Sequence, residues 1–216
     1  MSSRSAHPLA YPIGVTLGAL AVCAAWAPFA TVDQLAGLAT VALGILGYTG
    51  IRLLVAFGVL SCGLPEVLRV ARVRQQHRLV SRSWLEVTGP AGARRWLPVY
   101  FDPALVTFTE SSAEFDGRVL RAGALRLYPS GRARDTEPPG RLVDNPSRPD
   151  PDAPVLAASR VTRRLLFDVQ PAVAAPFAAL LWIYVDGGGL VAFVGALCVA
   201  AATATWLAAI RGSDPS

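Results

Sequence analysis

The sequence predicts an α-helical membrane protein with four transmembrane helices, arranged as two hairpins, and a small antiparallel β-rich cytosolic insert between them. Three observations lead to this fold class. Of the 216 residues, 53% are apolar and only 16% are charged, whereas an ordinary soluble domain carries about 25% charge. The apolar residues gather in four long runs, two near each end of the chain. Charged and turn-forming residues fill the segment between the two pairs of runs.

Each apolar run is long enough to cross a bilayer core of about 30 Å as a helix that rises about 1.5 Å per residue. We expect the four helices near residues 11–30, 35–60, 169–186 and 189–210. The first run also has features of a cleaved signal peptide, because Arg4 precedes it and Ala25-Trp26-Ala27 has a small-x-small pattern. Pro28 directly after that pattern and the length of the run favour an uncleaved anchor.

The positions of the arginines predict the orientation. The chain has no lysine, so arginine is its only strongly basic residue type, which together with the many Ala, Gly and Pro residues is typical of a GC-rich bacterial genome. Arginines flank the four runs on one side only, and the two short loops carry Asp33 and Asp186 instead. Because positive residues stay on the cytoplasmic side, we expect a multi-pass protein of the bacterial inner membrane. Both termini and the insert are then cytosolic.

Arg52 is the one charge in the interior of a predicted span, and such a residue can mark an ion or substrate path. The second run is longer than a bilayer requires, so we favour the interpretation that Arg52 reaches the cytosolic headgroups. Asp168 is the nearest acidic residue expected at the same interface, where a structural Arg52–Asp168 pair is the alternative. We expect anionic lipid headgroups to contact five arginines: Arg52, Arg69, Arg72, Arg163 and Arg164.

The fourth run carries small residues at every fourth position: Gly188, Ala192, Ala196, Ala200 and Ala204. A stripe of this kind lets two helix backbones approach closely in lipid. It serves either for packing within the four helices or for docking another membrane protein. The short third helix contains Pro171 and Pro176, and a kinked helix packs closely over only part of its length. We therefore predict that part of the stripe meets a permease-type partner subunit.

The chain divides into five predicted segments. A transmembrane hairpin (1–60) precedes an arginine-rich interfacial helix (61–82), because Leu64, Val67, Leu68 and Ala71 have helical spacing. A small β domain (83–134) follows, in which residues from Trp84 onwards alternate with period two and Asp116-Gly117 marks a hairpin turn. A flexible Pro-rich loop (135–154) leads to an interfacial helix and the C-terminal hairpin (155–216). The β domain is too small for a core of its own, so we expect it to lean on its surroundings.

Nothing in the sequence has the spacing of a catalytic, cofactor or metal motif, so we expect no enzyme activity, no cofactor and no metal. The three cysteines and two histidines are scattered, and Glu110, Glu114 and Asp116 flank a predicted turn, where acidic residues are common. The net charge of +5 suggests nucleic acid as a partner. Most of that charge lies at the membrane flanks, however, so we do not expect nucleic-acid binding.

The strand and turn at Arg95-Trp96-Leu97-Pro98-Val99-Tyr100-Phe101-Asp102-Pro103, together with the overall plan, resemble small actinobacterial membrane proteins, in particular the accessory membrane subunit of mycobacterial Mce lipid importers. This resemblance implies a non-catalytic subunit that sits beside the permease of a transport complex and assigns no functional residue. We therefore predict a non-enzymatic accessory or assembly subunit of a multi-subunit inner-membrane complex for lipid import. The alternatives are a membrane-bound enzyme that acts on lipid, centred on Arg52 and Asp168 or on the acidic group, and a small transporter that oligomerises with itself.

Overall fold

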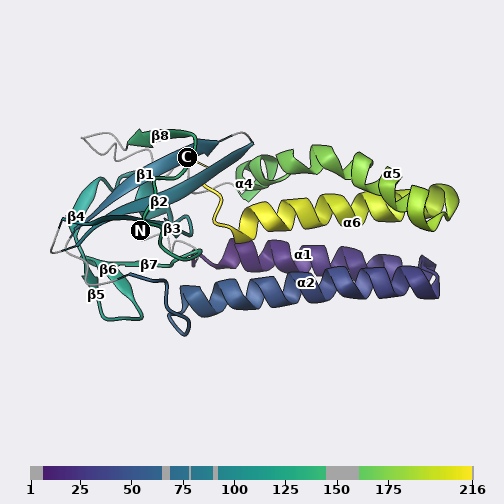
Figure 1. The fold of residues 1–216 in the computed structure, drawn as a ribbon, viewed down its shortest axis with the longest axis horizontal. Coiled ribbons are helices and arrows are strands. Elements are labelled where there is room, and N and C mark those ends of the chain that lie inside the picture. The colour runs from purple at the N-terminus through teal and green to yellow at the C-terminus, as the bar shows by residue number, and fades with distance from the viewer. Residues whose placement is uncertain (1–6, 65–68, 78, 90–91, 145–160, 216) are drawn as a thin grey trace, which may run out of the picture.

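The computed structural model describes residues 7–64, 69–77, 79–89, 92–144 and 161–215. Its helices lie side by side in one half of the molecule, and its strands form the other half (Figure 1). The helices are α1 (Ala10–Trp26), α2 (Val32–Ala56), α4 (Val161–Asp168), α5 (Ala175–Asp186) and α6 (Gly189–Ile210). Short 3-10 turns at Ala27–Phe29 and Gln170–Ala174 extend α1 and join α4 to α5. α6 is central, because both α1 and α5 pack along it.

Within the described residues, four helical segments are long and apolar enough to cross a membrane, as the sequence predicts. They are Ala10–Phe29, Val32–Ala56, Val161–Asp186 and Gly189–Ile210. The third segment begins at Val161, earlier than the predicted 169, since the residues ahead of Pro171 are already helical. Pro171 lacks a backbone N–H and therefore interrupts the regular helix, which explains the 3-10 turn between α4 and α5.

The chain reversals between the helices have local causes. Thr31 caps the N-terminus of α2: its hydroxyl accepts the N–H of Gln34, and the Gln34 side chain accepts the N–H of Thr31. Between α5 and α6, Gly187, Gly188 and Gly189 have φ values of +74°, +99° and +66°. Residues with a Cβ rarely adopt such angles, so the three glycines permit the tight reversal.

A five-stranded antiparallel sheet forms the larger part of the β region. Its order is β3 (Arg94–Val99), β2 (Val80–Thr88), β1 (Arg69–His77) and β4 (Glu110–Ser112), and β8 (Arg141–Asp144) also pairs with β1. A second sheet contains β5 (Glu114–Phe115), β6 (Leu120–Ala122) and β7 (Leu125–Leu127). The Asp116-Gly117 hairpin is confirmed: it joins β5 to β6, and Gly117 has a φ of +86°.

The prediction of an interfacial helix over 61–82 is wrong for the described residues. Residues 69–77 form strand β1, which is central in the sheet. The misleading signal comes from polar residues at buried positions, because Arg72 and Gln75 are both buried in β1. Arg72 pairs with Asp214, and Gln75 accepts the indole N–H of Trp84 at 2.7 Å. These partners lie elsewhere in the chain, so apolar periodicity alone does not reveal the strand.

Two further segments differ from expectation. The predicted Pro-rich loop contains β8, and the rest of it from 145 onwards lies outside the described residues. The interfacial helix expected from residue 155 is described only from Val161, where α4 begins. Within the predicted β domain, Pro103–Val106 form a 3-10 turn ahead of β4.

The sheet region and the helices share a hydrophobic core. Val55 of α2 is buried in one cluster with apolar residues of both sheets, among them Leu85 and Leu120. In a second cluster, Ala56 packs with Tyr100 and Tyr128. The Tyr100 hydroxyl also donates to the carbonyl of Ile210 at the end of α6, at 3.0 Å. The small β region therefore packs against the ends of the helices, as its size requires.

Candidate functional site

The small-residue stripe of α6 lines an apolar groove between the helices. Ala192, Ala196, Ala200 and Ala204 all contribute to its surface, together with residues of α2, the end of α1 and the segment from Pro171 to Trp182. The groove has a volume of about 450 Å³, within the range of about 300–1,000 Å³ that is usual for ligand sites. α2 and α5 make little contact with one another. The floor of the groove is therefore α6, and its opening lies between α2 and α5.

Two tryptophans narrow the groove at the end far from the sheets. A Cβ on Gly195 of α6 would lie 3.1 Å from the Trp26 ring, and a Cβ on Gly37 of α2 would lie 2.7 Å from the Trp182 ring. Both glycines thus make room for an indole. Gln34 also donates to Asp186 across this end at 3.1 Å. The pairing of each tryptophan with a glycine of a helix distant in the chain has no signal in the sequence.

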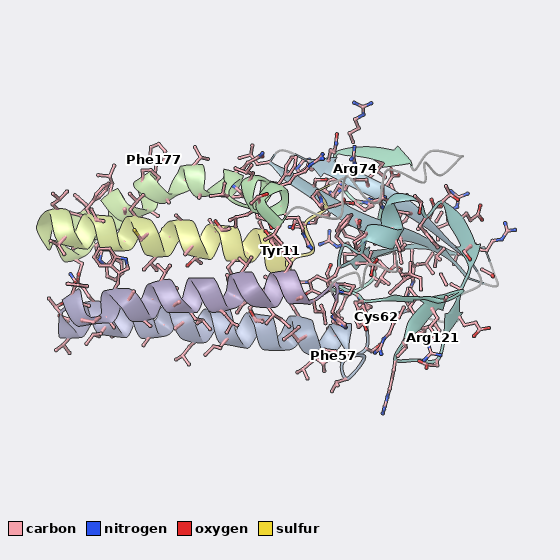
Figure 2. The ribbon with its side chains drawn as sticks, turned by 180° about the vertical axis from the view of Figure 1, so that it is seen from behind. Tyr11, Phe57, Cys62, Arg74, Arg121 and Phe177 are labelled. Atoms are coloured by element: carbon pink, nitrogen blue, oxygen red, sulfur yellow. The ribbon has the colours of Figure 1, made fainter. Side chains whose placement is uncertain are left out.

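Gly188, the first residue of the predicted stripe, lies at this end and does not line the groove. Its φ of +99° belongs to the reversal before α6, and a Cβ there would meet Ala192 at 2.6 Å and the Gln34 amide at 3.1 Å. Gly188 therefore shapes the turn, whereas the four alanines supply the floor. Phe177 of α5 is exposed and points away from the other helices (Figure 2).

A buried ion pair joins the sheet to the C-terminal segment. The Arg72 guanidinium donates from Nη2 to Asp214 Oδ2 at 2.6 Å, and both side chains are almost fully buried, at 2% and 0% exposure. Ser83 Oγ donates to the same carboxylate oxygen at 2.5 Å, and Arg72 Nη1 donates to the Leu105 carbonyl at 2.6 Å. The backbone N–H of Asp214 also bonds Ser81. The segment after α6 is thereby fixed to β1 and β2.

A second polar group lies where the ends of the helices meet the sheet. Asp168, buried at the end of α4, accepts from the Tyr11 hydroxyl at 2.6 Å and from Ser213 Oγ at 2.9 Å. The Arg164 guanidinium lies 3.9 Å from the centre of the Tyr11 ring and 5.4 Å from that of Phe101. Tyr11 is visible at the sheet-side end of α1 (Figure 2). These contacts tie α1, α4 and the C-terminal segment together.

The Arg52–Asp168 pair, considered above as an alternative, is not seen. Arg52 donates from Nη2 to the Tyr48 hydroxyl and from Nη1 to the carbonyl of Ser130, whereas Asp168 bonds Tyr11 and Ser213. The Arg52 side chain thus extends from the last turns of α2 towards the sheet. This direction agrees with the predicted displacement of its charge out of the apolar part of the helix.

No family model, no curated protein and no solved structure matches this chain.

The other arginines expected at a lipid surface lie in different surroundings. Arg72 is buried in an ion pair, so its prediction as a headgroup contact is wrong. Arg69 pairs with Glu110 at 3.4 Å where β1 meets β4, and Figure 1 places β4 at the end of the sheet away from the helices. Arg163 is exposed on α4 with its guanidinium 6.0 Å from the Phe167 ring centre. Arg164 is partly buried against Tyr11.

The acidic residues considered as a polar centre do not converge. Glu110 pairs with Arg69, and Glu114 is exposed on β5. Asp116 accepts the backbone N–H groups of Val119 and Arg118 at 2.6 and 2.9 Å. Those hydrogen bonds lower the pKa of the Asp116 carboxyl and hold the turn. Among the described residues, no three His, Cys, Asp or Glu side chains gather as metal ligands would.

Proposed function

We propose that the chain is a non-enzymatic accessory subunit of a multi-subunit complex in the bacterial inner membrane. In this proposal the four apolar helices span the bilayer, and both termini and the sheet region face the cytosol. The observation that carries the proposal is the groove over α6. Lipid import as the task of the complex follows from the resemblance to the accessory subunit of Mce importers.

The groove suits one transmembrane helix of a permease-type partner. Its floor consists of alanines four residues apart, so a second helix backbone can approach α6 closely. Close approach matters in a bilayer because lipid chains are as apolar as leucine, and helices associate there mainly through packing contacts. α2 and α5 make little contact with one another, so in this proposal the partner helix enters between them. The sheet region, at the end of the same helices, would then lie beside the cytosolic face of that partner.

Substitution of the groove floor tests the proposal. Ala196→Leu combined with Ala200→Leu fills the space above α6 with apolar bulk that lipid tolerates but a close helix interface does not. The tagged chain is purified from native membranes in mild detergent, and its companions are identified by mass spectrometry. We expect the double variant to lose at least nine-tenths of the companion subunit that the unsubstituted chain recovers reproducibly, about 1.4 kcal/mol or more of binding free energy.

A matched control is available on α1. Ala21 and Ala25 have the same spacing and are exposed away from the groove, so Ala21→Leu with Ala25→Leu adds equal bulk elsewhere. That variant should retain the companion. Full recovery of the companion by the groove variant, or recovery of the unsubstituted chain alone in every preparation, would refute the subunit proposal.

The orientation is tested separately. Pro139 is exposed in the sheet region, and a cysteine at this position, with Cys23, Cys62 and Cys198 replaced, is treated in whole cells with a thiol reagent that cannot cross membranes. A cytosolic sheet region predicts labelling only after the cells are permeabilised. Labelling in intact cells would show that the sheet region faces the outside and would refute the proposed orientation.

A further inference from the structure

Three arginines from distant parts of the chain meet at the sheet-side ends of α2 and α6. Arg52 belongs to the penultimate turn of α2, and Arg211 follows the last residue of α6. Both donate to the hydroxyl of Tyr48, Arg211 through Nε at 3.3 Å. Their guanidinium carbons lie 4.7 and 6.0 Å from the Tyr48 ring centre. Arg82 of β2 completes the group, because its backbone bridges to Ser213, two residues beyond Arg211.

The positive charge of Arg82 has no acidic partner among the described residues. Its Nε is buried without a hydrogen-bond acceptor, and the positive groups that act on it most strongly are Arg211 and Arg52, with a weaker effect from Arg134. Burial, followed by these like charges, lowers the pKa of Arg82 to about 10. Burial and like charges both disfavour the charged form of an arginine, so keeping Arg82 charged in the folded chain costs free energy.

Arg72 provides the contrast within the same sheet. Arg72 is almost fully buried, whereas Arg82 is half-buried with its Nε enclosed. The fold gives Arg72 the carboxylate of Asp214 at 2.6 Å and the carbonyl of Leu105. Arg82 lacks such compensation, and moving a charge even partly out of water is unfavourable unless the charge is paired. An anion between Arg82, Arg52 and Arg211 would supply the missing compensation.

We propose that Arg52, Arg82 and Arg211 form a binding site for a phosphate group. A guanidinium presents its N–H donors in a planar fork that matches phosphate oxygens. The described contacts of Arg52 and Arg211 occupy only some of these donors, and the Tyr48 hydroxyl holds the two side chains together. The site lies where the apolar helices end against the sheet, and basic pockets at that level bind the headgroups of anionic phospholipids. This site requires no partner subunit, so it stands or falls independently of the proposed groove.

The test compares two variants and a control in the full-length chain. Arg82→Gln and Arg211→Gln each remove one charge from the site, and Arg121→Gln removes one from an exposed position on β6. Each protein is purified in a neutral detergent and mixed with phosphatidylglycerol or with phosphatidylcholine, and bound lipid is counted by native mass spectrometry. We expect the unsubstituted chain and the β6 control to retain phosphatidylglycerol in preference to phosphatidylcholine. Both site variants should bind phosphatidylglycerol at least tenfold more weakly.

A stability measurement separates a lost ligand site from a damaged fold. Arg82→Gln removes a poorly compensated charge, so without anionic lipid its Tm should equal or exceed that of the unsubstituted chain. Phosphatidylglycerol should raise the Tm of the unsubstituted chain, because a ligand that binds only the folded state stabilises it, and should leave the Tm of Arg82→Gln unchanged. Inorganic phosphate forms a second arm: a Tm increase with phosphate but not with phosphatidylglycerol identifies a soluble phosphate compound as the ligand. Equal lipid retention and equal Tm shifts in all four proteins would overturn the proposal.

Discussion

The buried pair between Arg72 and Asp214 predicts a large loss of stability when its carboxylate is neutralised. Asp214→Asn keeps the shape of the side chain but leaves the Arg72 guanidinium, at 2% exposure, without its counter-charge. Breaking a buried pair in this way costs about 3–5 kcal/mol. The Ser83 hydroxyl, 2.5 Å from the same oxygen, then faces an amide that carries no negative charge. We therefore expect the loss of stability in this variant to lie in the upper part of this range.

Amide hydrogen exchange measures the loss of stability in the two strands that contain the residues around the ion pair. β1 and β2 flank the pair, and their amides exchange through opening of the sheet. A loss of about 3–5 kcal/mol accelerates that exchange by two to three orders of magnitude or slightly more, since about 1.4 kcal/mol corresponds to tenfold. Amides in the middle of α6 serve as an internal reference and should change less.

An exposed ion pair of the same sheet provides the control. Arg69 and Glu110 lie 3.4 Å apart with side-chain exposures of 72% and 57%, and such pairs contribute about 0–1 kcal/mol. Glu110→Gln should therefore leave the exchange of β2 almost unchanged. If Asp214→Asn accelerates exchange no more than Glu110→Gln does, the C-terminal segment does not stabilise the sheet as argued above.

Two further variants and one thiol-labelling experiment probe the junction between helices and sheet. Tyr11→Phe removes the hydroxyl that donates to buried Asp168 at 2.6 Å and should cost about 1–3 kcal/mol in thermal unfolding; an unchanged Tm would contradict the role assigned to this bond. Gly212→Ala should cost at least as much stability, because Gly212 has a φ of +83° and a Cβ there would lie 2.9 Å from the Val99 carbonyl oxygen. Gly63 also has a positive φ but has open space around it, so Gly63→Ala measures the loss of stability that the backbone angle alone causes. Burial raises the pKa of the Cys62 thiol, so iodoacetamide should modify Cys62 slowly near neutral pH and faster once the chain unfolds; rapid modification of the folded protein would show that this core opens readily.

Local patterns in the sequence determined the helices and several turns. Four long apolar runs predict four apolar helices because helix formation requires only neighbouring residues, and in each run nearly every side chain is apolar. Asp116-Gly117 predicts its hairpin for a similar reason, since the turn depends on two adjacent residues. The α6 alanines could be placed on one face from their spacing alone.

Tertiary structure decided which residues carry the candidate sites. β1 is a strand although its buried positions include Arg72 and Gln75, because Asp214 and Trp84 supply their polar partners from other elements. Likewise, Arg52 bonds Ser130 and not Asp168 because α2 ends against the sheet. Arg82 and Arg211 are 129 positions apart in the sequence, and the contacts between β2 and the C-terminal segment bring them together. Charges act through space, so a sequence shows which charges a chain carries, and the fold determines which of them meet.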